Sequence, residues 1–222
     1  MILVLVMLLI GTDFCHRDTE PTEIEIVIVK APNKEPRNPY QEEYEKLLYP
    51  TVRISSSCGV GSGVVISSTQ IYILTAAHVV EDQSIVDIEL FDLTSITATV
   101  VITDTVRDLA LLKPTGLISY SAQLAPRNYT PYIFTPVYTV GCSLGLTPRP
   151  SQGIISVVAK DHWEVSSPIL PGNSGGPVYD ARTYEVIGIA VWVKTYQGQL
   201  ITTMAGIITI QDIYTFLDQV KN

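Results

Sequence analysis

The sequence has few of the residues that build metal sites and disulfide frameworks. Its 222 residues include only three cysteines and three histidines. The cysteines, Cys15, Cys58 and Cys142, stand far apart, and their odd number leaves at least one thiol free. We therefore interpret them as small apolar side chains of the core. No spacing indicates a metal or another cofactor.

Charged residues are also scarce, at 16% of the chain, and 22 acidic side chains outnumber 14 basic ones. The formal net charge of −8 would repel a phosphate backbone, which argues against a nucleic acid as partner. Hydrophobic residues make up 46% of the chain. That share excludes a disordered chain, because burying so much apolar surface offsets the conformational entropy that the chain loses on folding.

The apolar run at residues 1–10 (MILVLVMLLI) is followed by Gly11 and Asp13. It reaches about half the ~20 residues that a membrane-spanning helix needs. Its length suits a secretory signal, but no basic residue precedes it. The sequence therefore leaves open membrane association through residues 1–10, export and a cytoplasmic location, and it does not indicate an oligomeric state.

Residues 1–48 combine this apolar segment with an acidic, proline-containing extension, which indicates a linker or a surface segment and not a second core. Within the extension, residues 23–30 alternate as one strand would. Residues 40–48 have the pattern of two helical turns.

From residue 49 onward, short runs rich in Val, Ile and Thr are separated by Gly, Ser, Pro or Asp, a pattern that predicts strands. Their spacing leaves no room for the crossover helices that parallel strands require. The fold class is therefore all-β, with antiparallel barrels. The runs lie at 51–55, 62–67, 72–75, 84–90, 96–102, 110–113, 137–141, 153–158, 177–179, 186–193 and 199–210.

Prolines and a glycine interrupt every pattern between Pro114 and Pro136. This break predicts two lobes, at about 49–115 and about 131–210, within one domain at 49–215. Residues 210–222 are expected to form a short C-terminal helix, because their apolar residues fall on one helical face. These are Ile213, Phe216, Leu217 and Val220.

The densest chemical signal is Gly172-Asn-Ser-Gly-Gly-Pro177. Glycines around a serine permit a tight turn that exposes the hydroxyl and points backbone N–H groups at one place, although a plain hairpin loop has the same composition. The residues also match the nucleophile elbow of α/β-hydrolases, which requires a histidine downstream of the serine. All three histidines, His16, His78 and His162, precede Ser174. The elbow is therefore excluded.

The order His, Asp, Ser remains. His78 follows an apolar run and two alanines, and Asp108 stands at the start of a strongly apolar run. A carboxylate in such a position is costly unless it has a donor such as an imidazole N–H. Together with Ser174, these residues predict a catalytic triad.

The motifs around these residues resemble those of trypsin-like serine proteases. The three signatures are Leu74-Thr-Ala-Ala-His78, Asp108-Leu-Ala-Leu-Leu-Lys113 and Gly172-Asn-Ser-Gly-Gly-Pro177. Gly61-Ser-Gly-Val-Val-Ile66 and Val140-Gly-Cys-Ser-Leu-Gly145 also resemble the bacterial high-temperature-requirement (HtrA/Deg) type. The resemblance covers about residues 52–210. It implies two six-stranded antiparallel β-barrels packed against each other, and the short remainder of the chain predicts no PDZ domain.

The resemblance further implies a serine endopeptidase that acts on polypeptides. Ser174 would attack the carbonyl, His78 would act as general base, and Asp108 would orient the imidazole. The backbone N–H groups of Gly172 and Ser174 would form the oxyanion hole. Asn173, in the same loop, carries no carboxylate to pair with a new amino terminus, so we expect no trypsin-style activation by cleavage.

The resemblance also implies a substrate pocket with Pro168 at its base, where a carboxylate would select Arg or Lys. Apolar side chains around it predict small or medium aliphatic P1 residues in unfolded or flexible protein segments. The expected lining is Ile169, Leu170, Val191 and Val193. Two alternatives stay open, a trypsin-fold binding module that has lost turnover and a virus-encoded, self-processing protease.

Overall fold

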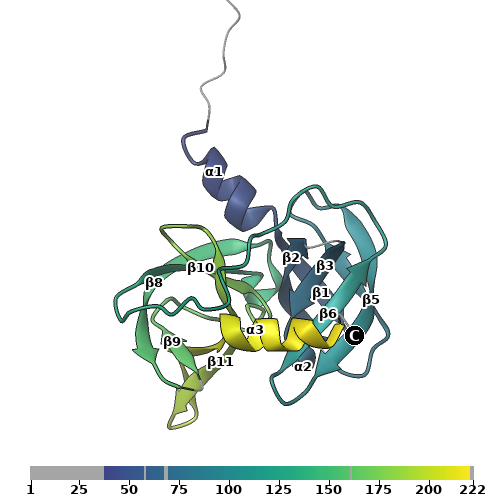
Figure 1. The fold of residues 1–222 in the computed structure, drawn as a ribbon. Coiled ribbons are helices and arrows are strands. Elements are labelled where there is room, and N and C mark those ends of the chain that lie inside the picture. The colour runs from purple at the N-terminus through teal and green to yellow at the C-terminus, as the bar shows by residue number, and fades with distance from the viewer. Residues whose placement is uncertain (1–37, 58, 68–69, 161, 221–222) are drawn as a thin grey trace, which may run out of the picture. The chain divides into compact units, whose positions relative to one another are not determined.

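The computed structural model describes residues 38–57, 59–67, 70–160 and 162–220. Twelve strands form two closed antiparallel barrels of six strands each (Figure 1). The expected all-β fold with two six-stranded barrels is therefore confirmed. The apolar run at residues 1–10, the strand expected at 23–30, and Cys15 and Cys58 lie outside the described residues. No helix within the described ranges has the length and apolar composition needed to cross a bilayer.

The first barrel closes with its strands in the order β1-β2-β3-β6-β5-β4. Its core takes side chains from alternate positions, as in β4, where Val86 and Ile88 are buried between more exposed neighbours. Burial of one such aliphatic side chain contributes roughly 1.5–3 kcal/mol. The strands are β1 (Thr51–Ser56), β2 (Gly59–Ser67), β3 (Ile71–Thr75), β4 (Ile85–Glu89), β5 (Ser95–Asp104) and β6 (Leu109–Pro114).

The second barrel closes in the order β10-β11-β12-β9-β8-β7. Eleven strands match predicted runs, but β9 was not predicted. Three residues are too few for an alternating pattern, and β9 is specified by its pairing with β8 on one side and β12 on the other. The strands are β7 (Pro136–Gly141), β8 (Arg149–Val158), β9 (Trp163–Val165), β10 (Pro177–Asp180), β11 (Val186–Tyr196) and β12 (Gln199–Thr209).

A segment rich in turns connects the barrels. Strand β6 ends at Pro114 and β7 begins at Pro136, so the prolines that interrupt the sequence patterns mark the connection. Isolated bridges tie this segment to both barrels, from Ala122 to Ile66 of β2 and from Leu124 to Val186 of β11. The connection therefore runs along the surface and does not form a further layer.

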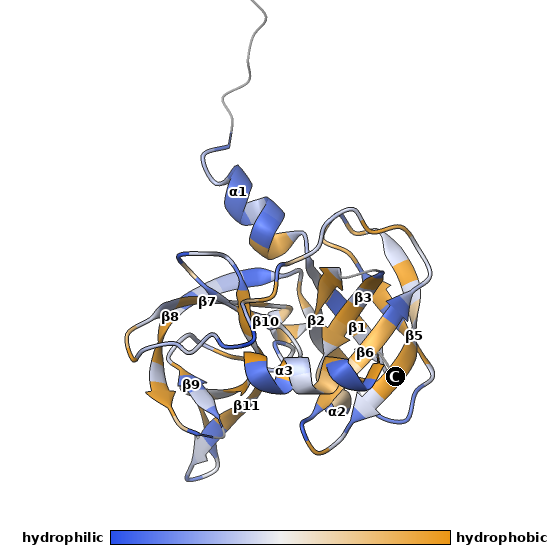
Figure 2. Cartoon of the chain, viewed as in Figure 1, coloured by the Kyte–Doolittle hydropathy of each residue, from blue (hydrophilic) through white to orange (hydrophobic). Residues whose placement is uncertain are grey.

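Two helical segments lie at the start of the described chain, α1 (Gln41–Glu43) and the π-helical η1 (Tyr44–Leu48). The helical turns expected at residues 40–48 are present. Figure 2 shows that this element is hydrophilic except near the barrels, and there Leu47 and Leu48 are buried. These helical segments belong to the compact unit that spans Asn38–Asn222.

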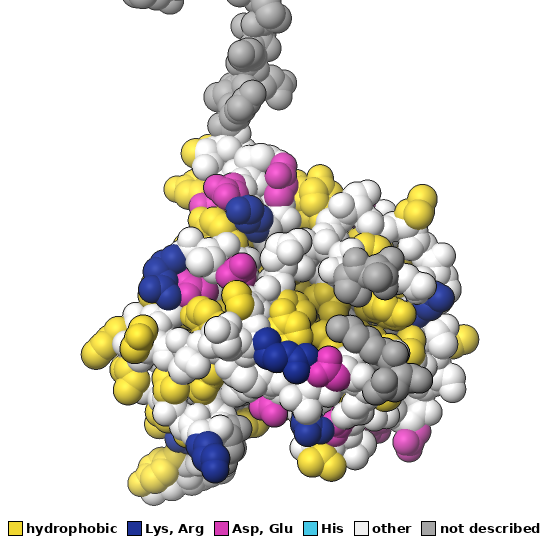
Figure 3. All heavy atoms as spheres, viewed as in Figure 1, with side chains coloured by type: hydrophobic (Ala, Val, Ile, Leu, Met, Phe, Trp, Pro, Cys, Tyr) yellow, Lys and Arg dark blue, Asp and Glu magenta, His cyan; other side chains and the backbone are white. Residues whose placement is uncertain are grey.

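The predicted C-terminal helix is also present, as α3 (Ile210–Leu217) followed by the 3₁₀ turn η3 (Asp218–Val220). The Thr209 hydroxyl caps its start by accepting a hydrogen bond from the Asp212 N–H. Ile213 and Phe216 are buried in the core beneath it. Figure 3 shows that, on the face carrying this helix, cationic and anionic side chains are interspersed and do not gather by sign.

Candidate active site

His78 projects from a short helix at the end of β3. This helix, α2 (Ala77–Val80), buries Ala77, Val79 and Val80 in the first barrel and leaves His78 exposed. Its first N–H, that of Ala77, donates to the Asp108 carbonyl at 3.1 Å. The apolar residues on either side of His78 therefore fix the backbone and turn the imidazole outward.

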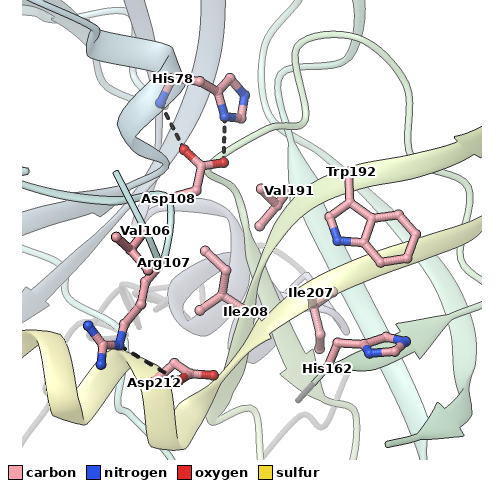
Figure 4. Close-up of a pocket in the computed structure, with 10 residues that line it drawn as sticks. All are labelled: His78, Val106, Arg107, Asp108, His162, Val191, Trp192, Ile207, Ile208 and Asp212. Carbon is pink, nitrogen blue, oxygen red and sulfur yellow. Dashed lines mark hydrogen bonds and ion pairs between the residues drawn. The ribbon is translucent and has the colours of Figure 1, made fainter. Parts of the chain in front are cut away.

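Asp108 lies directly before β6 and accepts two hydrogen bonds from one residue. The His78 backbone N–H reaches Oδ1 at 2.9 Å, and His78 Nδ1 lies 2.7 Å from Oδ2 (Figure 4). Asp108 has a φ of 58°, a left-handed conformation that is uncommon for a residue with a side chain and occurs often at functional sites. The two bonds fix the orientation of the imidazole on the first barrel.

The hydrogen bond to Asp108 raises the pKa of His78 above its usual value. Partial burial of the ring opposes this shift, and the negative charges of Asp108 and Glu81 add to it. A carboxylate accepts hydrogen bonds, so Nδ1 carries the proton and Nε2 is left as the basic atom of the neutral ring. The imidazole is thus suited to accept a proton at Nε2.

Ser174 lies in the loop before β10 and belongs to the second barrel. Gly175 beside it has a φ of +82°, and a Cβ there would meet Thr75 Oγ1 and would lie 2.9 Å from the Ala76 nitrogen. The loop backbone therefore packs directly against the segment that leads into His78. No hydrogen bond between described residues joins the Ser174 hydroxyl to His78, and such bonds often tighten only when substrate binds.

Two backbone N–H groups of this loop have no partner among the described residues, those of Gly172 and Ser174. The Pro171 carbonyl accepts from Leu144 N–H at 2.7 Å, and the Asn173 carbonyl accepts from Gly176 N–H at 2.9 Å. In a trans peptide the N–H points opposite to the carbonyl. These bonds therefore point the Gly172 and Ser174 N–H groups away from Leu144 and Gly176, the residues that bind the two carbonyls. Two neighbouring free donors are what an oxyanion hole requires.

Asn173 lies between these two donors in the sequence, and its buried side chain and its backbone both hold the loop in place. Its side-chain Oδ1 accepts from Ser143 Oγ at 2.6 Å, and its N–H donates to the Leu170 carbonyl at 3.0 Å. Ser143 begins the 3₁₀ turn η2 (Ser143–Gly145), in which Leu144 adopts a φ of 56°. The amide therefore connects the loop to the turn that binds Pro171.

A groove of about 550 Å³ lies between the barrels, beside His78 and Asp108 (Figure 4). Both barrels and α3 contribute to its walls. The sequence did not single out Trp192 or His162, although Trp192 directly follows Val191 in the same strand. The lining residues are His78, Val106, Arg107, Asp108, His162, Val191, Trp192, Ile207, Ile208 and Asp212.

Of the five residues expected in the substrate pocket, Val191 lines this groove. The pairing of β11 with β12 shifts between Ala190 and Trp192, so Val191 is a bulge residue without a partner on β12. Val193 is half-buried farther along the strand, and Pro168 is exposed. Ile169 is buried in the core, and Leu170 is 37% exposed.

Comparison with known proteins identifies relatives of this chain. A family model described as a trypsin-like peptidase domain matches residues 61–189. A Synechocystis protein named "Putative serine protease HhoB" is 35% identical over 154 residues, which cover 61% of this chain and 35% of that protein. A Pseudomonas fluorescens protein named "Probable periplasmic serine endoprotease DegP-like" is 31% identical over 153 residues, covering 63% of this chain and 30% of that protein.

A solved structure shares the fold. The crystal structure of the serine endoprotease from Yersinia pestis matches with a TM-score of 0.70 and 24% sequence identity, covering 83% of this chain and 67% of that one. The chain spans about a third of the length of the two curated relatives named in the preceding paragraph.

Proposed function

Because the chain belongs to the family of trypsin-like peptidase domains, we propose that it is a serine endopeptidase with Ser174 as nucleophile. The proposal rests on two halves of the site, one on each barrel. One is the imidazole of His78 bonded to Asp108, and the other is a serine loop with two free N–H donors packed beside it. Each half is suited to one part of acyl transfer.

In the proposed reaction, Ser174 Oγ attacks the scissile carbonyl carbon while His78 Nε2 takes the hydroxyl proton. Asp108 stabilises the imidazolium that forms. The carbonyl oxygen, now an anion, binds the N–H groups of Gly172 and Ser174, and one such donor is worth about 3 kcal/mol in the transition state. The imidazolium then protonates the leaving amine, and water hydrolyses the acyl-enzyme by the same route.

The groove between the barrels suits an extended polypeptide. Val191 has no partner on β12 at the point where the groove passes His78, and we propose that a substrate segment pairs with the backbone of β11 there. Val191 and Val193 are apolar, and Pro168 supplies no carboxylate for a basic side chain. We propose cleavage after small or medium aliphatic residues in unfolded or flexible segments.

We propose that the enzyme is not activated by a newly formed amino terminus. Asn173 Oδ1 already accepts a hydrogen bond from Ser143, and an amide offers no charge to an ammonium group. A sharp rise in activity on removal of residues 1–48 would contradict this point if substitution of Asn173 abolished the rise.

The test is labelling by a serine-directed fluorophosphonate, together with cleavage of a denatured protein and mapping of the cut sites. We expect an adduct on Ser174 and cuts after aliphatic residues. The Ser174→Ala variant should lose the adduct and about 10⁶-fold in kcat. Wild-type protein that forms no adduct and cleaves nothing would instead support a binding module, and cuts mostly after Arg or Lys would overturn the proposed specificity.

A further inference from the structure

Ser62 of β2 is fully buried at the junction of the two barrels, and the triad does not include it. Its Oγ accepts a hydrogen bond from the Cys142 N–H at 2.8 Å and donates one to the Gly172 carbonyl at 2.6 Å. A backbone N–H only donates and a carbonyl only accepts, so the directions of both bonds are fixed. The hydroxyl proton of Ser62 is therefore committed to Gly172.

The backbone of Ser62 binds the same region. Its N–H donates to the Ser174 carbonyl at 2.8 Å, and its carbonyl accepts from Thr75 Oγ1 at 2.6 Å. Ser62 thus binds the carbonyls of Gly172 and Ser174, whose own N–H groups have no partner within the described part of the loop and its surroundings. Through Thr75 it is also connected to the segment that leads into His78.

Glycines surround this side chain and leave room for little more than a hydroxyl. A Cβ on Gly141 would lie 3.0 Å from Ser62 Oγ, and a Cβ on Gly176 would lie 3.2 Å from Ser62 Cβ. Gly61 is equally close to the loop, with a Cβ position 3.2 Å from the Ser174 carbonyl. The site therefore accommodates a small donor in one defined orientation.

We propose that Ser62 is a positioning residue of the oxyanion hole. Its hydroxyl, bridging Cys142 N–H and Gly172 C=O, fixes the peptide between Gly172 and Asn173, so that the neighbouring N–H groups face the reacting carbonyl. The inference rests on the proposed peptidase function and adds a residue to it.

The physical reason is the freedom of Gly172. This residue has a φ of +96° and no side chain to restrict its backbone, so hydrogen bonds must select one conformation. Without the Ser62 hydroxyl, the Gly172 carbonyl loses its donor and the Cys142 N–H loses its acceptor, at a cost to the conformation that buries both. The loop would then populate conformations in which the free N–H groups no longer point at the substrate.

The test compares Ser62→Ala with Thr51→Val. Thr51 is a matched control because it is also a fully buried hydroxyl of the first barrel that donates to a backbone carbonyl, that of Leu47, at 2.7 Å. We expect Ser62→Ala to lower kcat by about 10- to 100-fold with KM changed by less than about twofold, since positioning is worth less than the donor itself. Thr51→Val should change the melting temperature and leave kcat within about twofold.

A second readout isolates the oxyanion hole. A peptide boronate forms a tetrahedral adduct whose oxygen occupies the hole, so its affinity should fall in Ser62→Ala by the same factor as kcat. A peptide amide of the same sequence, which forms no tetrahedral adduct and carries no terminal carboxylate, should bind both proteins equally. If Ser62→Ala does not fold, Ser62→Gly makes the same test, because it also removes the hydroxyl and adds no volume to the crowded site.

The outcomes separate the two proposals. An active wild-type enzyme whose kcat and boronate affinity are unchanged in the Ser62 variants overturns the role of Ser62 alone. An equal loss of activity in Thr51→Val also overturns it, because the effect would then be one of general stability. A wild-type protein without activity or adduct overturns the peptidase proposal, and this inference with it.

Discussion

His78 and Asp108 lie on the first barrel and are held by side chains, whereas Ser174 lies on the second and is held by its backbone. In the first half of the site, one carboxylate binds the imidazole and the helix N–H together. In the second half, the carbonyls of Pro171, Gly172 and Ser174 are each bound by a donor from another segment. In the proposed mechanism, the chemistry of the first half depends on side-chain identity, and that of the second depends on backbone conformation.

The largest effect that tests this comparison is expected in the side-chain half. Asp108→Asn should lower kcat by about 10⁴-fold, because an amide no longer selects the imidazole tautomer with a basic Nε2. Asp104→Asn is the matched control, since Asp104 accepts bonds from Val106 and Arg107 in the same turn and does not touch His78. Steady-state kinetics on both variants measures the effect, and a comparable loss in Asp104→Asn would contradict it.

In the backbone half, Gly172→Ala should lower kcat by about 10²- to 10³-fold, the effect of losing one oxyanion donor. Its positive φ disfavours a side chain, and a Cβ there would meet the Cys142 carbonyl. Gly198→Ala is the control, because Gly198 has a φ of +79° with nothing within 4 Å of its Cβ position. Equal kcat in the two variants would show that loop geometry at residue 172 does not matter.

A smaller effect concerns pH. In the proposed mechanism, attack requires the neutral imidazole. Because Asp108 raises the pKa of His78, kcat/KM should increase with pH through a midpoint above 6.5. The charge of Glu81 adds to this shift, and Glu81→Gln should therefore move the midpoint to lower pH. A pH–rate profile measures both. A midpoint that stays in place or rises in Glu81→Gln would contradict the electrostatic assignment.

The smallest effect is expected at Cys142, whose backbone N–H donates to Ser62 Oγ and whose buried thiol has no role in the proposed reaction. Burial raises the pKa of this thiol to about 11, so iodoacetamide at pH 8 should leave Cys142 unmodified in the native protein and modify it in denaturant. Cys142→Ala should keep kcat within about threefold of wild type. Rapid native labelling mapped to Cys142 by mass spectrometry would be inconsistent with its burial.

The strands could largely be predicted from the sequence, because eleven of them fall in short runs rich in Val, Ile and Thr that are bounded by turn residues. Their ends could not. Strand β8 begins at Arg149, four residues before the predicted run, since Gly141 and Val140 of β7 continue to pair there. Strand β9 has no pattern of its own and exists only as the partner of two longer strands.

The residue types of the site were also evident from the sequence, since a histidine, an aspartate and a glycine-flanked serine each stand at the edge of an apolar run. The groove was less predictable. Ile169 is buried in the core and Pro168 is exposed, while Trp192 and His162 line the groove instead. Sequence alone does not give this arrangement, because the path of a loop depends on which segments pack beneath it.

Local patterns of the chain thus determined its class of fold, its strands and the chemical groups present at the proposed site, because burial and turn formation act over a few neighbouring residues. Only the tertiary structure decided how the serine loop is supported. The hydroxyl of Ser62 meets the carbonyl of Gly172 across 110 residues of sequence. A hydrogen bond between distant segments leaves no periodic signal, and it forms only after both barrels have placed its two atoms together.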